Sequence, residues 1–67
     1  MELSARNQLR GRVKQVKTDG LMAEVVIDVG GQEVVSVITR TSAEALKLEA
    51  GANVTVVIKS TEVMLAR

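Results

Sequence analysis

Hydrophobic and polar residues alternate along the first part of the chain. Leu9, Gly11 and Val13 occupy alternate positions, with arginines between them. Since successive side chains of a β-strand point to opposite faces, this pattern predicts a strand that begins near Leu9 and runs to about Lys17. Residues 18–20 read Thr-Asp-Gly, a combination typical of turns. The first element is therefore expected to be a strand that ends in a turn.

Two further strands are expected on either side of a glycine pair. Residues 23–29 carry alanine, valine or isoleucine at every second position, and Gly30-Gly31 follows directly. A two-glycine connection between alternating segments is typical of a β-hairpin. The next segment, 32–39, is apolar on both faces. A strand of that kind is either central in its sheet or covered on one face by another subunit.

A short helix and two last strands complete the expected order of elements. Thr41 and Glu44 have the spacing of a capping box, which predicts a helix that starts at Thr41, and Gly51 is the expected end of that helix. Residues 53–59 alternate again and predict a fourth strand. Residues 61–66 are expected to form a short closing strand.

This order of elements predicts an all-β fold. The expected architecture is a small OB-like five-stranded barrel with one short helix between strands 3 and 4, formed by one domain over residues 1–67. Closure of a barrel, or contact with a partner, would remove exposed strand edges. An SH3-like barrel stays open as an alternative. The length and the single helix exclude a doubly wound α/β fold.

The composition limits how stable such a domain can be on its own. The 67 residues include no Cys, no His and no aromatic residue, so the core is aliphatic and a structural zinc site is not expected. A core of this size supplies roughly 3–5 kcal/mol, and small domains therefore often depend on a disulfide, a metal or an oligomer. Without cysteine or a metal site, self-association is the expected route to stability.

Several classes of function are disfavoured by the residues present. The net charge of +1 and the lack of aromatic residues argue against nucleic-acid binding. No G-x-S-x-G, P-loop or H-E-x-x-H motif occurs, so no enzymatic activity is expected. The N-terminus does not resemble a signal peptide, and no apolar stretch is long enough to span a bilayer. We therefore expect a cytoplasmic protein without membrane association.

Anion binding is the chemistry that the side chains favour. Hydroxyl groups and cations stand at the expected ends of strands and at the start of the helix, where they and unpaired N–H groups can bind negative charge. The residues concerned are Ser4, Arg6, Thr39, Ser42, Lys59 and Ser60. Arg10 and Arg12 are interpreted instead as solvated charges on the outer face of the first strand.

The same residues lie in motifs that resemble a known family. They are S-A-R-N-Q-L-R-G from Ser4, S-V-I-T ending at Thr39, T-S-A-E-A-L from Thr41 and I-K-S-T-E-V-M from Ile58. In this order and spacing they resemble the molbindin (Mop) family of small molybdate-binding proteins. The resemblance covers essentially the whole chain.

The resemblance implies a specific function. Members of the family bind molybdate or tungstate as intact tetrahedral dianions at subunit interfaces, without catalysis, and single-module members form homohexamers arranged as trimers of dimers. This chain is accordingly expected to store or buffer these oxyanions inside the cell. The resemblance assigns the site to the side chains named above and to backbone N–H groups, with these residues: Ser4, Ala5, Arg6, Thr39, Ser42, Ala43, Lys59 and Ser60.

Three other interpretations are weaker. An OB-type nucleic-acid-binding module is opposed by the charge and the missing aromatic residues. A purely structural oligomerisation module with an incidental anion site stays open as an alternative. A site for a molybdopterin cofactor is disfavoured because the chain offers no aromatic platform for the pterin ring.

Overall fold

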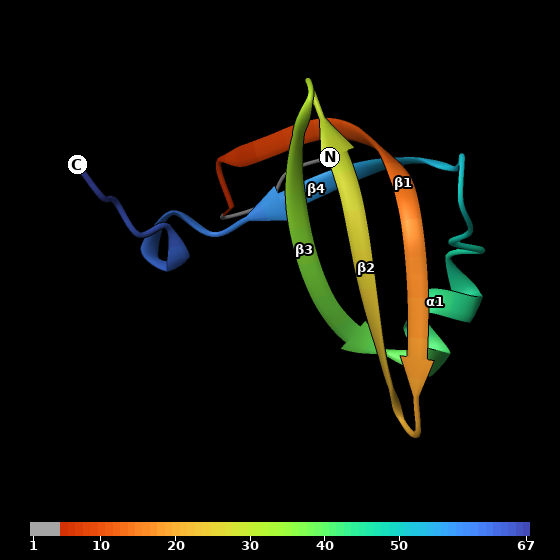
Figure 1. Cartoon of the computed structure of the whole chain (residues 1–67). Coiled ribbons are helices and arrows are strands. Elements are labelled where there is room, and N and C mark those ends of the chain that lie inside the picture. The colour runs from red at the N-terminus through yellow and green to blue at the C-terminus, as the bar shows by residue number, and fades with distance from the viewer. Residues whose placement is uncertain (1–4) are drawn as a thin grey trace.

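A computed structural model describes residues 5–67 and contains four strands and one short α-helix (Figure 1). The N-terminal residues 1–4, including Ser4 of the expected site, lie outside the described residues. In chain order the elements are β1 (Asn7–Asp19), β2 (Met22–Val29), β3 (Gln32–Thr39), α1 (Arg40–Ala45) and β4 (Asn53–Ile58), followed by a 3-10 turn at Ser60–Glu62. Within residues 5–67, no helix is both long and apolar enough to cross a lipid bilayer.

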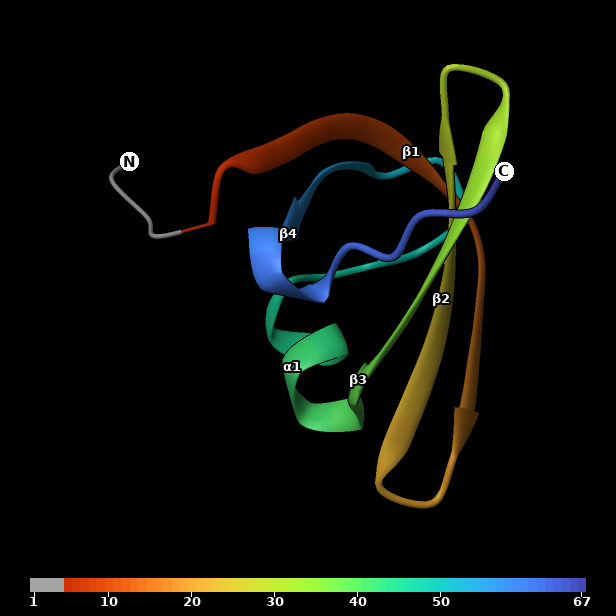
Figure 2. The same cartoon turned by 90° about the vertical axis from the view of Figure 1, so that its left-hand side faces the viewer.

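The four strands form one antiparallel sheet in the order β3-β2-β1-β4. The first half of β1 pairs with β4 and its second half pairs with β2, so β1 bends sharply where it passes from one partner to the other (Figure 2). The register is irregular between Val13 and Gln15, which leaves Lys14 outside the pairing. The Glu33 carboxylate, through a hydrogen bond and its charge, raises the pKa of Lys14 above its usual value.

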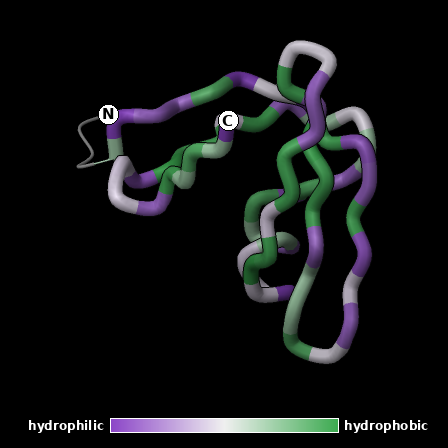
Figure 3. The backbone as a smooth tube through the Cα atoms, turned by 60° about the vertical axis from the view of Figure 1, so that its left-hand side comes forward, coloured by the Kyte–Doolittle hydropathy of each residue, from purple (hydrophilic) through white to green (hydrophobic). Residues whose placement is uncertain are grey.

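The core lies inside this bend. Hydrophobic and hydrophilic residues alternate along the strands (Figure 3), and the inward-facing residues Val13, Val25 and Ile27 are almost fully buried. Gly11 faces the same interior, where an added Cβ would lie 2.6 Å from Cγ2 of Ile27 and 2.8 Å from the carbonyl oxygen of Asp28. The close approach of β1 and β2 therefore requires glycine at this position.

The hairpin expected at the glycine pair is confirmed. Gly30 and Gly31 connect β2 to β3 with φ angles of 58° and 90°, the left-handed backbone that such two-residue turns require. The side chain of Asp28 accepts a 2.9 Å hydrogen bond from the Gly31 N–H. The predicted strand over residues 32–39 also matches β3. It is an edge strand rather than a central one, and Val35 and Val37, which lie on its face turned away from the core, are 57% and 62% exposed.

The predicted start and end of the helix were wrong. The N-cap is Thr39, two residues before the expected Thr41, and its Oγ1 accepts a 3.1 Å hydrogen bond from the Ser42 N–H. The Arg40 N–H donates to the carbonyl of Leu21 at 2.8 Å, which fixes the chain at the point where β3 passes into α1. The helix ends at Ala45, well before Gly51, because Lys47 adopts the left-handed conformation (φ 53°) and the Leu48 N–H donates back to the Ala43 carbonyl at 3.1 Å, an arrangement that terminates helices.

The predicted fifth strand is not formed within residues 5–67. Residues 60–62 form the 3-10 turn, and the segment from Val63 onward has no regular structure and leads away from the sheet (Figure 1). Met64 and Leu65 are 92% and 93% exposed. Among the described residues the outer edges of β3 and β4 consequently have no neighbouring strand, and the expected five-stranded barrel is instead an open, bent four-stranded sheet.

Candidate functional site

Part of the expected site assembles at the end of a two-stranded arm. We define the arm as residues 7–12 of β1 and their partners 53–58 in β4. At its tip Asn7 is paired with Ile58, and the Asn7 side-chain amide donates a 3.2 Å hydrogen bond to the Ile58 carbonyl. Arg6 and Lys59 are each one residue beyond this pair. The pairing therefore places an arginine and a lysine that are 53 positions apart in sequence just beyond the adjacent ends of two neighbouring strands.

The two cations at the arm tip are not neutralised by described residues. The ion pairs within residues 5–67 are Lys14 with Glu33 and Arg40 with Glu44. Arg6 and Lys59 are both exposed, and neither has a carboxylate partner in this part of the chain. A guanidinium and an ammonium placed together can balance the charge of a dianion and donate hydrogen bonds to its oxygens.

Two further predicted residues lie at the same tip. Ala5 is half-buried, and its carbonyl accepts a 3.5 Å hydrogen bond from the side chain of Gln8, which holds the chain near the start of β1. Ser60 is exposed and opens the 3-10 turn, where its carbonyl accepts from the Val63 N–H at 3.5 Å. The arm tip therefore combines Ala5, Arg6, Lys59 and Ser60.

The remaining predicted residues gather where β3 meets α1. The hydroxyl of Thr39 donates a 2.7 Å hydrogen bond to Oγ of Ser42, which leaves the hydroxyl hydrogen of Ser42 free to donate to an anion. Ala43 is buried and offers only its backbone. In a helix capped at Thr39, the Ala43 N–H closes the first turn. The Ser42 hydroxyl is consequently the better donor of the two.

One chain does not bring these two clusters together. The arm tip and the start of α1 lie well apart in Figure 1, and α1 packs against β2 and β3. Each cluster is therefore half of the donor set that the sequence predicts: cations at the arm tip, and hydroxyl groups at the start of the helix.

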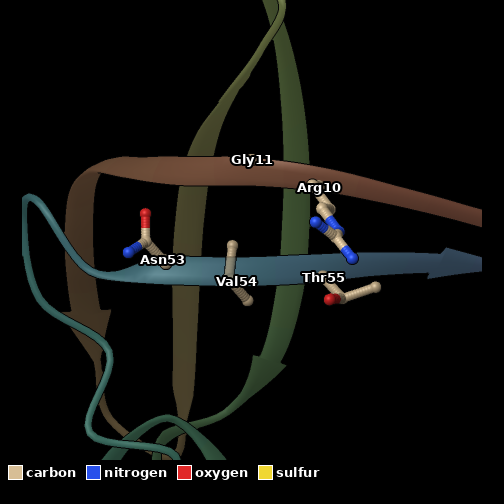
Figure 4. A pocket seen from close by; sticks show the side chains of 5 residues that line it. All are labelled: Arg10, Gly11, Asn53, Val54 and Thr55. Carbon is tan, nitrogen blue, oxygen red and sulfur yellow. The ribbon is translucent and has the colours of Figure 1, made fainter.

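A third group of polar side chains is not predicted by the sequence pattern. Arg10, Asn53 and Thr55 line an open pocket on the arm (Figure 4). From the sequence, Arg10 is interpreted as a solvated charge, because alternation shows the face of the strand on which a residue lies. Alternation does not show which residues of a partner strand lie beside it. The pairing of β1 with β4, which the sequence pattern does not specify, creates this group.

Comparisons with known proteins agree with this architecture. A relative from Clostridium pasteurianum, molybdenum-pterin-binding protein 1, is 47% identical over 66 residues, 97% of each chain. A molybdate-binding protein from Sporomusa ovata, 37% identical, superposes along the full length of both chains with a TM-score of 0.95. The cytoplasmic molybdate-binding protein ModG, solved with molybdate bound, matches with a TM-score of 0.86 and 41% identity over 90% of this chain and 43% of its own.

These matches confirm the resemblance to small molybdate-binding proteins and the mostly-β fold with one short helix. The family model that matches the sequence, over residues 3–65, is the TOBE domain. Because that match spans nearly the whole chain, this protein belongs to the TOBE domain family.

Proposed function

We propose that this protein binds molybdate as the intact tetrahedral dianion and stores or buffers it without catalysis. The observation that carries the proposal is the arm tip, where the exposed cations Arg6 and Lys59 lie beside the hydroxyl of Ser60 with no described carboxylate to neutralise them. The structural neighbours from Sporomusa ovata and ModG are named molybdate-binding proteins, which supports the same ligand, and the name of the Clostridium pasteurianum relative, molybdenum-pterin-binding protein 1, supports a ligand that contains molybdenum. A cytoplasmic location is part of the proposal, and the description of ModG as cytoplasmic supports it.

The chemistry of the donors suits an oxyanion better than a bare metal ion. Within residues 5–67 no cluster of three or more acidic, histidine or cysteine side chains is present. The oxygens of molybdate enclose the metal, so the protein needs only hydrogen-bond donors and positive charge. One arginine and one lysine balance a charge of −2. Tungstate has the same charge and shape and is expected to bind through the same groups.

The site is proposed to be completed between two copies of the chain. A single copy separates the cationic arm tip from the start of α1 (Figure 1), where Thr39 and Ser42 carry their hydroxyl groups. If the arm tip of one copy meets the start of α1 in another, both halves contact the same anion. This arrangement supports the homo-oligomer, a hexamer built as a trimer of dimers, that the family resemblance implies.

Exposed apolar surface supports self-association independently. Val35 and Val37 on the edge strand and Met64 and Leu65 in the C-terminal segment are all more than half exposed. Apolar groups gathered on strands with unpaired edges are typical of surfaces that bind another chain. Burying them between copies would add to the small core of one chain.

Calorimetric titration tests the proposed function. Wild-type protein is expected to bind molybdate saturably and more tightly than sulfate or phosphate. Arg6→Ala should lower the molybdate affinity at least tenfold, which corresponds to about 1.4 kcal/mol, because it removes one of the two charges that balance the anion. Arg12→Ala is the matched control, since it removes an arginine of the same strand outside the arm tip. Equally weak binding of all three anions by the wild-type protein would contradict the proposal.

A further inference from the structure

The open pocket that Arg10, Asn53 and Thr55 line lies on the outer face of the arm. Arg10 of β1 is paired with Thr55 of β4, and Gly11 is paired with Val54. These residues and Asn53 line an open pocket of about 500 Å³. In Figure 4 the guanidinium of Arg10 extends across to Thr55 on one side of the pocket, and Asn53 lies on the other side. We call this pocket the arm trough.

The side chains of the arm trough are hydrogen-bond donors without an acidic competitor. Arg10 supplies a guanidinium, Thr55 a hydroxyl and Asn53 an amide. Neither strand of the arm contains a carboxylate over residues 7–12 and 53–58. Within residues 5–67 Arg10 makes no ion pair. Its positive charge is therefore available to a ligand.

Arg12 differs from Arg10 although it is equally basic. Both lie on the same face of β1, two residues apart, which is about 7 Å along a strand. Arg12 is opposite Asp28 in the β1–β2 register, whereas Arg10 is paired only with the neutral Thr55. Arg12 does not line the arm trough. Arg10 is therefore the arginine of the pair that lines the arm trough and has no carboxylate opposite it.

The arm trough is separate from the molybdate site proposed above. Arg10 is four residues, or about 13 Å of strand, from Arg6 at the arm tip. None of the residues that line the arm trough belongs to the arm tip or to the start of α1. Binding in the arm trough therefore does not depend on the proposed function.

We propose that the arm trough binds a phosphate group, either as inorganic phosphate or at the end of a phosphomonoester. The planar guanidinium of Arg10 can donate two parallel hydrogen bonds to phosphate oxygens, and Thr55 and Asn53 can donate to the others. The pocket volume falls in the range of small-molecule sites. The chain has no aromatic side chain on which an organic ring could stack, so recognition rests on the phosphate.

Amide chemical shifts of the ¹⁵N-labelled, assembled protein test this proposal. Inorganic phosphate and a nucleoside monophosphate are titrated separately, and the amides of Gly11, Asn53 and Thr55 are expected to shift saturably. Arg10→Ala should weaken binding of both probes at least tenfold. Arg10→Lys should weaken it less, because the charge remains but the paired donors are lost. Arg12→Ala is the matched control and should change the affinity less than threefold.

The outcomes separate the arm trough from the molybdate site. Equal affinities for the two probes would show that only the phosphate group is bound. Tighter binding of the nucleoside monophosphate would place its organic part along the arm trough. Both results support the proposal. In Arg6→Ala protein the phosphate-induced shifts at Gly11, Asn53 and Thr55 should persist. Three results would overturn the proposal, whatever happens to molybdate binding. They are loss of the phosphate-induced shifts in Arg6→Ala, absence of these shifts in wild-type protein, and unchanged phosphate affinity in Arg10→Ala.

Discussion

Thr39 has two roles in this structure, because it ends a strand and caps a helix. Its Oγ1 accepts from the Ser42 N–H at 3.1 Å and its hydroxyl donates to Oγ of Ser42 at 2.7 Å. The sequence favoured Thr41 as the cap, since Thr41 and Glu44 have capping-box spacing. Glu44 instead approaches Arg40, with 3.3 Å between Oε1 and Nε. The Arg40 N–H donates to the carbonyl of Leu21, and this contact favours Thr39 over Thr41 as the helix cap. Because the contact is nonlocal, it leaves no pattern in the sequence.

The two threonines give a matched pair of substitutions. Thr39→Ala should lower the free energy of unfolding by about 0.5–2 kcal/mol, because it removes the N-cap acceptor. Thr41→Ala removes a similar hydroxyl that caps nothing and should have a smaller effect. Urea unfolding of both variants measures the difference. A larger loss for Thr41→Ala would show that the helix starts where the sequence pattern predicts.

Gly11 is needed for its small size rather than for its backbone conformation. A Cβ at this position would lie 2.6 Å from a side-chain carbon of Ile27 and 2.8 Å from a backbone oxygen that cannot move easily. Gly11→Ala should therefore destabilise the fold by about 1–3 kcal/mol, as overpacking of a core does. Thermal unfolding measures the effect, with Gln8→Ala on the exposed face of the same strand as the control. Equal stability of the two variants would contradict the close approach of β1 and β2.

At the scale of elements, alternation in the sequence predicted the strands but not all of their partners. The hairpin at Gly30-Gly31 and the strand over 32–39 are confirmed, because their signals are local. The pairing of Asn7 with Ile58 joins residues at opposite ends of the chain, and a period-two pattern specifies faces rather than partners. Half of the candidate site, the arm tip, depends on this pairing and could not be predicted from spacing alone.

The C-terminal segment was predicted as a strand for the same reason. Residues 61–66 alternate, but a strand also needs a free edge beside it, and this segment leads away from the sheet of its own chain (Figure 1). The segment presents Met64 and Leu65 to solvent. Its apolar side chains are therefore available to another copy.

Acidic substitutions in this segment test that role. Met64→Asp combined with Leu65→Asp should shift the protein to smaller assemblies in native mass spectrometry, because charged groups would replace apolar ones at the contact. Thr61→Asp combined with Ala66→Asp adds the same charge without removing a large apolar side chain and is the control. An assembly of unchanged size in the first variant would show that the segment does not contribute to self-association.

At the scale of the whole molecule, the position of the candidate site follows from the openness of the fold. The four-stranded sheet leaves the outer edges of β3 and β4 unpaired, and the two halves of the expected donor set lie apart. The sequence predicts donor types that suit an oxyanion, but their distribution over two clusters depends on the bend of β1. Under the proposed function, each complete site therefore requires two copies of the chain.

Complementation between variants tests this requirement most directly. Arg6→Ala damages only the arm tip, and Ser42→Ala damages only the start of α1. Each variant alone should lack tight molybdate sites in a calorimetric titration. After the two are unfolded together, refolded as mixed assemblies and titrated again, tight sites should reappear, because an intact arm tip from one chain can meet an intact Ser42 from the other. Mixed assemblies that bind no better than either parent, while wild-type protein refolded in the same way binds tightly, would contradict a site shared between subunits.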